Sequence, residues 1–440
     1  MKSDISGFPE FLPNEQIAFN KMLDTIRSYF EFRGFLPMDT AAVERIGTLV
    51  SKGNDKEIYG LYRIADEDSK KDLGLRFDLT VPLARYISSN GGQLLFPFKR
   101  YQIGSVWRGE RPQFGRYRQF YQCDIDIIGD GELSVAHDAE VISTVIKILE
   151  ALGIPPFITK INNRKILFGF LQRFVPEEKI TEAITLIDKA DKISQEEFDN
   201  SMYALGVKKE LLSKIKSFSS SAKNRDNFDV IDWLKKLTFG PEFSEGVAEL
   251  EETLTLLKKL GIGDNLIEVS LGLARGLNYY TGNIFETTLI DYPDVGSISG
   301  GGRYDNLSYM ISQKKYPGVG ATIGITRLFT KLLEKNLINC ETNATAEILI
   351  TVQNREFLSS YMKIAAKFRK AGMKAEIYLQ DKSLGAQLSY ASRRGYKFVL
   401  IANEMELVDG KAILRNLETK EQKIVRIEFI RADILSSFMK

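Results

Sequence analysis

Residues 98–131 read FKRYQIGSVWRGERPQFGRYRQFYQCDIDIIGDG. The stretch holds five arginines and seven aromatic residues and then a short acidic cluster. Residues typical of strands at both ends, with a Pro- and Gly-containing loop between them, predict a strand–loop–strand hairpin. Because alternate residues of a strand share a face, Gln122, Asp124 and Asp126 are expected to line one face together.

The hairpin has two chemical interpretations. Arginine suits phosphate oxygens, because its planar guanidinium donates two parallel charge-assisted hydrogen bonds and stays protonated. In the first interpretation Arg108 binds a nucleotide phosphate, Phe120 stacks on a base and Glu110 accepts from an exocyclic amine. The cationic loop ERPQFGRYR would then reach a second polyanion. In the second interpretation the segment is a surface hairpin held by salt bridges.

Composition bounds the class of protein. The 440 residues leave room for two or three domains, and 44% hydrophobic with 27% charged residues is typical of a soluble globular chain. No apolar run reaches the roughly 18 residues of a membrane span, and the N-terminal MKSDISGFPEF lacks a signal-peptide core, which predicts a cytoplasmic protein. The two cysteines, Cys123 and Cys340, exclude a disulfide framework, and the single histidine, His137, is expected to be structural.

Charge is unevenly distributed along the chain. Residues 340–440 hold 17 Lys and Arg against 12 Asp and Glu, a balance of +5, which leaves −3 for the rest of the +2 total. A basic C-terminal module favours a separate contact with an anionic ligand, although a solvated surface would have the same composition.

Periodicity outlines the other elements. Residues 162–261 are Lys/Glu-rich and predict an inserted helical subdomain with a polar break at SFSSSAKNRDN, and NLINCETNATA is a candidate linker. After it, AEILITVQ, KAEIYL and KFVLIA alternate with helices and predict a small α/β domain with a mainly parallel sheet. Helices are expected at 13–31, 136–152, 320–333, 357–370 and 384–394, and strands within 76–86, 98–126 and 157–161.

The hairpin resembles motif 2 of the class II aminoacyl-tRNA synthetases, in the form found in the histidyl-tRNA synthetase family. Further stretches resemble the same family in the same order: LRFDLTVPLARY (75–86), LARGLNYYTGNIFE (273–286), GSISGGGRYDNL (296–307), GVGATIGITRLF (318–329) and LGAQLSYASRRGYKFVLI (384–401). The resemblance covers nearly the whole chain, although the helical insertion matches in position and length only.

The resemblance implies an α+β protein. A class II antiparallel-sheet catalytic domain would span residues 1–335, interrupted by the helical insertion at about 165–260. A linker at 336–345 would lead to a C-terminal α/β anticodon-binding domain at 346–440.

The implied activity is ATP-dependent activation of L-histidine to histidyl-adenylate and transfer to the 3′ end of tRNA(His). Mg²⁺ would accompany ATP without a dedicated protein site, and the implied assembly is a homodimer with no membrane contact. Three alternatives remain: a regulatory subunit that binds histidine without aminoacylation, a tRNA-sensing pseudo-synthetase, and a class II synthetase for another amino acid.

The resemblance also implies the roles of individual residues. Arg275 and Arg108 would be catalytic, and Asp126 and Tyr280 would face the two imidazole nitrogens. Tyr279 is expected to belong to the core, because in a strand it points away from Tyr280. The ATP site would comprise Arg108, Glu110, Arg116, Phe120, Arg275 and Arg327. The histidine site would comprise Asp78, Thr80, Gln122, Asp126, Tyr280, Gly300 and Gly302. The tRNA acceptor end would meet Arg111, Gln113 and Arg116.

Three smaller points complete the sequence interpretation. GVGATIG lacks the G-x-G-x-x-G order of a dinucleotide loop, so Gly320 and Gly324 are expected to let a helix pack closely on the sheet. Gly300–Gly302 is interpreted as backbone lining the histidine pocket, with a tight turn as the alternative. The chain departs from the family at Ala41, where motif 1 normally has proline, and at Asn278, where the signature normally has aspartate.

Overall fold

The computed structural model describes residues 5–49, 73–112, 115–190, 193–274, 280–305, 314–340 and 343–427, together with the backbone of 59–61. The chain forms two compact units. The first comprises Met1–Pro9 and Met22–Leu337, and the second comprises Glu10–Lys21 and Ile338–Lys440. Helix α1 (Pro13–Phe32) therefore contributes residues to both units.

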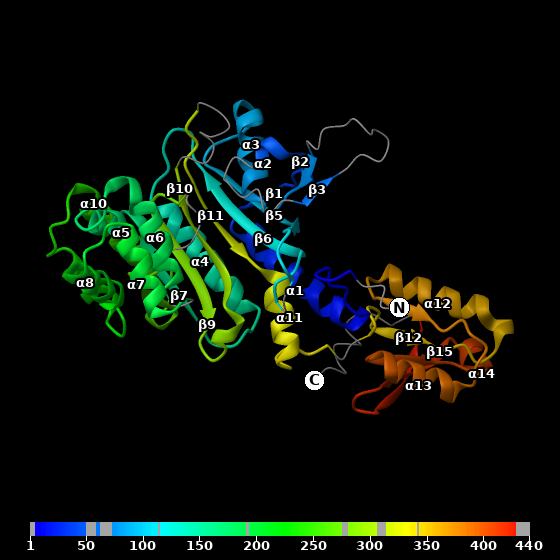
Figure 1. The fold of residues 1–440 in the computed structure, drawn as a ribbon. Helices are drawn as coiled ribbons and strands as arrows, with labels where there is room; N and C mark the ends of the chain where they lie inside the picture. Colours follow the sequence, from blue (N-terminus) through cyan, green and yellow to red (C-terminus); the bar gives the residue numbers. More distant parts are fainter. Residues whose placement is uncertain are drawn as a thin grey trace. The chain divides into compact units, whose positions relative to one another are not determined.

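A mixed, mainly antiparallel sheet is the centre of the first unit (Figure 1). Only the outermost pairs, β1 with β5 and β7 with β8, run parallel. In sheet order the strands are β1 (Leu36–Pro37), β5 (Phe98–Trp107), β6 (Gln119–Ile128), β11 (Gly318–Ile323), β10 (Ser297–Tyr304), β9 (Asn283–Leu289), β7 (Phe157–Asn163) and β8 (Ile267–Val269). The expected antiparallel-rich α+β fold is confirmed.

The predicted hairpin is present as β5 and β6, which pair in register from Phe98 opposite Ile128 to Trp107 opposite Gln119. Its even-numbered residues share one face, and its odd-numbered residues share the other. Helix α4 (Ala136–Ala151), which matches the helix predicted at 136–152, packs against β6, β10 and β11. With one face covered by a helix, the site must be sought on the opposite face.

Residues 80–86 were predicted as strand, and that prediction is wrong. They belong to helix α3 (Thr80–Asn90), which follows the short strand β4 (Leu73–Leu75). The apolar side chains at 81, 83, 84 and 87 are all buried, and this tertiary burial outweighs the strand preference of individual residues. Strand β4 lies between β2 (Val43–Arg45) and β3 (Tyr59–Leu61) in a small separate sheet beside α2 (Ile46–Leu49).

The helix predicted over 320–333 begins later than expected. Residues 318–323 are the central strand β11, and helix α11 (Ile325–Glu334) follows it. Gly320 therefore pairs with Asp126 on one side and Gly302 on the other, and does not mediate a helix–sheet contact. The tight-turn alternative for residues 300–302 is also wrong, because all three glycines lie inside β10.

The inserted segment is helical, as predicted, and its helices gather at one end of the sheet (Figure 1, green). The polar stretch 217–227 is helical as far as Ser220, because Phe218 is buried and stacked on Phe170 with ring centroids 3.9 Å apart. The helices are α5 (Arg164–Leu171), α6 (Ile180–Lys189), α7 (Gln195–Ala204), α8 (Lys209–Ser220), α9 (Asn227–Leu234) and α10 (Pro241–Lys259).

The second unit contains the expected α/β domain. Strands β13 (Ala375–Ile377), β12 (Ile348–Ile350) and β14 (Phe398–Ile401) run parallel. The sequence interpretation missed the antiparallel extension by β15 (Lys411–Asn416) and β16 (Gln422–Arg426). The flanking helices are α12 (Leu358–Lys370), α13 (Leu384–Arg394) and the short α14 (Glu404–Val408).

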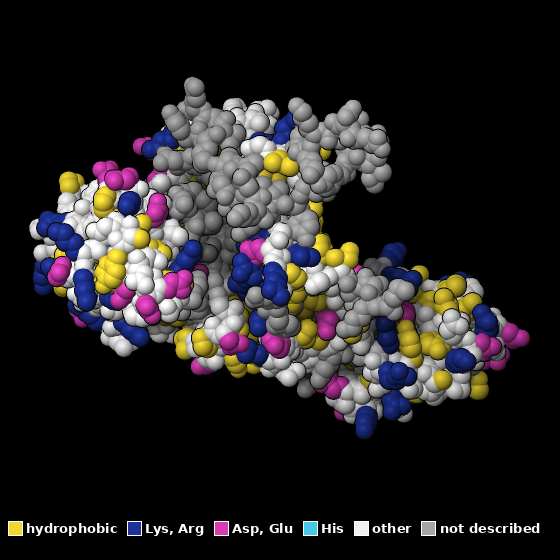
Figure 2. All heavy atoms as spheres, in the orientation of Figure 1, with side chains coloured by type: hydrophobic (Ala, Val, Ile, Leu, Met, Phe, Trp, Pro, Cys, Tyr) yellow, Lys and Arg dark blue, Asp and Glu magenta, His cyan; other side chains and the backbone are white. Residues whose placement is uncertain are grey.

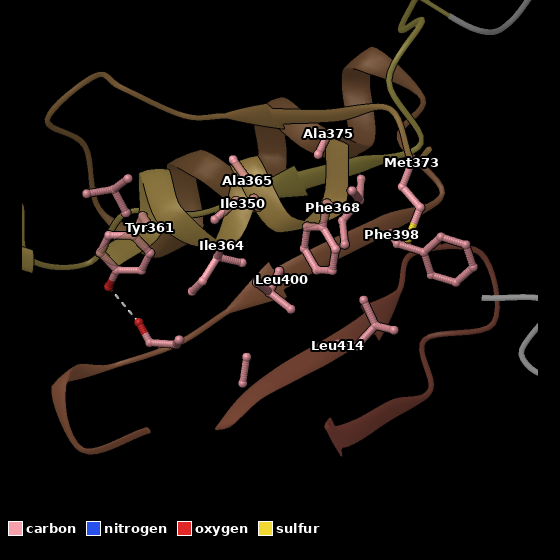
Figure 3. Close-up of a cluster of buried hydrophobic side chains, with 14 residues drawn as sticks. Ile350, Tyr361, Ile364, Ala365, Phe368, Met373, Ala375, Phe398, Leu400 and Leu414 are labelled. Atoms are coloured by element: carbon pink, nitrogen blue, oxygen red, sulfur yellow. Dashed lines mark hydrogen bonds between the residues drawn. The ribbon is translucent and has the colours of Figure 1, made fainter. Parts of the chain in front are cut away.

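One face of this second sheet is closed by an apolar cluster against α12 (Figure 3). The Tyr361 hydroxyl lies inside the cluster and donates to the Ala402 carbonyl at 2.7 Å, so its buried polar atom is paired. Across the described ranges of the whole chain, none of the helices has the length and apolar character needed to cross a membrane.

Candidate active site

The face of the large sheet opposite α4 carries most of the predicted site residues. Strand register places Arg100 opposite Asp126, Gln102 opposite Asp124 and Gly104 opposite Gln122. The same rows continue through Gly320 and Thr322 of β11, Gly300 and Gly302 of β10, and Ile284 and Glu286 of β9. A floor lined by several glycines leaves room above the sheet for a ligand.

Asp126 is held rigidly in this floor. It is 3% exposed, and its Oδ2 lies 2.6 Å from Nη2 of the fully buried Arg100. The Tyr304 hydroxyl donates to its Oδ1, and that contact together with burial raises the pKa of Tyr304. A carboxylate paired with a guanidinium and a phenol in this way is preorganised as a hydrogen-bond acceptor.

Two glycines make room for the predicted imidazole-binding pair. A Cβ at Gly320 would lie 2.0 Å from Asp126 Oδ1, and a Cβ at Gly302 would lie 2.8 Å from the Tyr280 ring. Gly320 and Gly302 are direct partners across β11 and β10. Asp126 and the buried Tyr280 therefore rest on adjacent positions of the floor.

Gln122 and Asp124 lie beside Asp126 on the same face of β6. Gln122 Oε1 and Asp124 Oδ1 are both buried and have no hydrogen-bond partner in the described part of the chain. Burial, with Asp126 nearby, raises the pKa of Asp124 to about 8, although Arg100 acts in the opposite direction. Asp78 also acts on this group, which places it near the same corner.

The segment before α3 runs along β5 and carries Asp78 and Thr80. The Phe77 carbonyl accepts from Arg108 Nε at 3.2 Å, and the Leu79 carbonyl accepts from Arg100 Nη2 at 3.4 Å. Asp78 Oδ1 accepts from the Val81 amide at 2.9 Å and so helps to start α3. Both predicted residues therefore stand at the border of the floor.

A cluster of arginines occupies the other end of the hairpin. The Arg108 guanidinium lies over the Phe120 ring, 5.1 Å from its centroid. Arg116 is paired with Glu110, and this contact lowers the pKa of the Glu110 carboxyl, with smaller contributions from Arg108 and Arg327.

Arg327 completes this cluster. Its Nε donates to the Gly115 carbonyl at 2.9 Å, and burial together with Arg108 and Arg116 lowers its pKa. Three mutually repelling guanidiniums, with Glu110 and Glu286 as the nearby carboxylates, would be stabilised by an anion. The predicted nucleotide residues of the described chain are thus brought together.

Some predicted residues are not placed in the site. Arg275, Gln113 and Tyr279 lie outside the described residues, as does Asn278. Arg111 is exposed, and Ala41 is exposed as well. Among the described residues, no group of three or more His, Cys, Asp and Glu side chains could hold a metal ion.

Three residues of the floor were absent from the predicted site: Arg100, Asp124 and Tyr304. Asp124 was placed on the correct face by alternation but was given no role. Arg100 would be found by pairing the two strands about their loop, and Tyr304 lies two residues after a predicted pocket glycine.

The architecture of the first unit is that of a class II aminoacyl-tRNA synthetase catalytic domain, and the second unit carries an anticodon-binding α/β domain. The family model for histidyl-tRNA synthetase matches residues 7–328, and the anticodon-binding domain model matches residues 347–436. The chain belongs to the histidyl-tRNA synthetase family.

Individual relatives are named as members of the same family. Histidine–tRNA ligase of Clostridium tetani is 40% identical over 435 residues, which cover 97% of this chain and 98% of the relative. The crystal structure of histidyl-tRNA synthetase from Nostoc sp. PCC 7120 is 38% identical, with a TM-score of 0.90 over 100% of this chain and 99% of the other. A third similar structure comes from Bacillus halodurans and is titled ATP phosphoribosyltransferase regulatory subunit/histidyl-tRNA synthetase. It is 20% identical, with a TM-score of 0.73 over 91% of this chain and 97% of the other. At this identity the likeness shows the fold alone.

Proposed function

We propose that the chain is a histidine–tRNA ligase, which activates L-histidine with ATP and transfers it to the 3′ end of tRNA(His). The observation that carries the proposal is the fixed carboxylate of Asp126 beside Tyr280, on a floor shared with an arginine cluster. The names of the full-length relatives support the same activity.

The chemical step is attack of the histidine carboxylate on the α-phosphorus of ATP. A bond forms between a carboxylate oxygen and phosphorus, the bond to the bridging oxygen breaks, and pyrophosphate leaves. Catalysis of this kind rests on in-line positioning and on fixed positive charge around the phosphoryl group. Arg108 would bind the α-phosphate, Arg327 and Arg116 would contact the rest of the nucleotide, and Phe120 and Glu110 would hold the adenine. Arg275 is proposed as the catalytic charge at the α-phosphate.

The imidazole has one donor and one acceptor nitrogen in its neutral form. Asp126 would accept from one nitrogen, and the Tyr280 hydroxyl would donate to the other. Gly300 and Gly302 would form the wall beneath the ring. A site that pairs both nitrogens rejects analogues that lack them by large factors, because its buried polar groups would be left unpaired. Gln122, Asp78 and Thr80 would bind the α-amino group.

Mg²⁺ would arrive with ATP. We propose that this ion is bound mainly by phosphate oxygens and water, because Mg²⁺ gives up its waters reluctantly and usually binds through substrate phosphates. Its contribution would be to neutralise phosphate charge, while the arginines orient the nucleotide.

The remaining proposals concern the tRNA partner, the domain boundaries and the cellular location. The second unit would bind the anticodon, and Figure 2 shows Lys and Arg side chains in separate spots over its visible face. Arg111, Gln113 and Arg116 would meet the tRNA acceptor end. We also propose domain limits of 1–335 and 346–440, an insertion at about 165–260 and a cytoplasmic location.

A homodimer is proposed from the apolar edge of the first unit. Phe32 at the end of α1 is 84% exposed, and Leu36 on the edge strand β1 is 57% exposed. Exposed large apolar side chains grouped near an edge strand are typical of an interface.

Amino-acid-dependent pyrophosphate exchange tests the proposal. We expect exchange with L-histidine and with none of the other amino acids, followed by charging of tRNA(His). Histidine binding without exchange would favour the regulatory-subunit alternative. Replacing Arg275 by alanine should lower exchange by about two orders of magnitude or more while histidine binding survives.

A further inference from the structure

Gln122 Oε1 and Asp124 Oδ1 are two acceptor oxygens in one corner of the floor, where Nε and Nη1 of Arg100 are also buried without a hydrogen-bond partner in the described part of the chain. The two side chains are 7% and 2% exposed, both oxygens are buried, and neither has a partner in the described part of the chain. They are two residues apart on one strand face, and Asp78 is close enough to act on the Asp124 carboxyl. Native proteins rarely leave such groups unpaired, so the corner points to a missing donor.

The charged groups around Asp124 are few. Arg100 faces it from β5, Asp126 from its own strand, and Asp78 from the segment before α3, while β11 contributes the hydroxyl of Thr322. The only positive charge in this set, Arg100, lies 2.6 Å from Asp126 and is shared with it. Among the described residues, the carboxyl of Asp124 therefore has no cation of its own, and its neutral acid form is favoured.

We propose that Asp124 belongs to the subsite for the substrate's ammonium group, and that its carboxyl gives up a proton to water when the ammonium enters. The inference rests on the proposed function and assigns a role to a residue outside the expected ammonium set of Asp78, Thr80 and Gln122. An ammonium has three N–H donors, which match the oxygens of Gln122, Asp124 and Asp78. A cation close to a buried carboxyl group favours the charged form of that group, so the incoming ammonium would favour loss of the Asp124 proton.

The proton balance is simple. The empty site holds a carboxylic acid, and the incoming substrate holds a cationic ammonium. In the complex a carboxylate faces the ammonium, and one proton has passed to the buffer. Because the proton must leave before the ion pair forms, binding strengthens as the pH rises toward the pKa of Asp124, which is about 8.

Isothermal titration calorimetry of the full-length protein in two buffers of different ionisation enthalpy measures this proton. At pH 7 a group with a pKa of about 8 is roughly nine-tenths protonated, so histidine should release about 0.9 proton per site. Between pH 7 and pH 8 the dissociation constant should fall about fivefold.

Asp124→Asn is the matched variant, because an amide resembles the neutral acid in shape and cannot lose a proton. It should bind histidine more weakly, release less than about 0.2 proton, and change its dissociation constant less than about 1.5-fold over the same pH range. Protons that belong to the ligand's imidazole contribute equally to both proteins. An unchanged proton release in Asp124→Asn would overturn the proposal.

Ligand analogues test the wild-type protein without any variant. Histamine keeps the ammonium and should release the proton, whereas imidazolepropionate lacks the ammonium and should bind without release. Release with imidazolepropionate, or histidine binding with no release at all, would overturn the role of Asp124 and leave the proposed function standing. Failure of histidine to bind would remove both proposals.

Discussion

The substitution Gly320→Ala tests the geometry of the floor directly. Its methyl group would lie 2.0 Å from Asp126 Oδ1 and 2.9 Å from the Ile125 carbonyl oxygen, closer than real Cβ atoms approach. Asp126 has no free direction in which to move, because Arg100 and Tyr304 hold its two oxygens. Overpacking costs about 1–3 kcal/mol, and separation of a buried ion pair costs about 3–5 kcal/mol. We expect a loss of about 3 kcal/mol in the free energy of unfolding, and a large rise in the KM for histidine.

Gly324→Ala is the matched control at the end of the same strand. The nearest atom to its added methyl is the Ile298 carbonyl oxygen at 3.7 Å, an ordinary contact, so we expect a change below about 1 kcal/mol. Both tryptophans, Trp107 and Trp233, belong to the first unit, so tryptophan fluorescence during urea unfolding reports on that unit alone. Equal unfolding midpoints for the two variants, with unchanged KM for histidine in pyrophosphate exchange, would refute the reasoning.

Three further substitutions probe the same floor. Arg100→Met should lower the free energy of unfolding by about 3–5 kcal/mol in urea titrations, because Asp126 is left buried without its cation, and near-wild-type stability would contradict this pairing. Tyr304→Phe removes one donor to Asp126 and should raise the KM for histidine about tenfold, or more, in pyrophosphate exchange while the fold survives. Asp124→Asn tests how stability depends on pH. The pKa of the Asp124 carboxyl rises from 3.8 in the unfolded chain to about 8 in the folded chain, so the wild type loses stability as the pH rises between these values. The melting temperature of the variant relative to that of the wild type should therefore increase from pH 5 to pH 8, and a constant difference would contradict the raised pKa.

The strand–loop–strand segment shows which features of the site the sequence predicts and which it does not. Alternation alone predicted that Gln122, Asp124 and Asp126 share a face, because the side-chain period of a strand does not depend on its partners. The pairing of Arg100 with Asp126 depends on strand register, which is set by the length and shape of the intervening loop. Local pattern could not supply that register, so the cation beside Asp126 was missed.

The predicted role of the glycines in 318–324 was wrong for a related reason. Gly320 and Gly324 are four residues apart, a spacing that suits a helix face, and the helix was therefore begun too early. In the folded unit Gly320 is needed for a different purpose, because a side chain from the neighbouring strand occupies the space above it. Only the pairing of β6 with β11 reveals that requirement. The roles of Arg275 and Gln113 remain predictions from the sequence.

The charge balance of the floor connects the two ends of the proposed substrate. One buried guanidinium, Arg100, faces two carboxyl groups, Asp124 and Asp126, and it lies within 2.6 Å of only the second. Asp126 is thus paired with a cation in the absence of ligand and would accept from an imidazole N–H without reorganisation. In the proposal above, Asp124 would gain a counter-charge when an ammonium enters. A ligand with an imidazole alone would leave the acceptor corner unpaired, and one with an ammonium alone would leave Asp126 without its imidazole donor. With these proposed roles, the floor would favour a molecule that carries both an imidazole and an ammonium group.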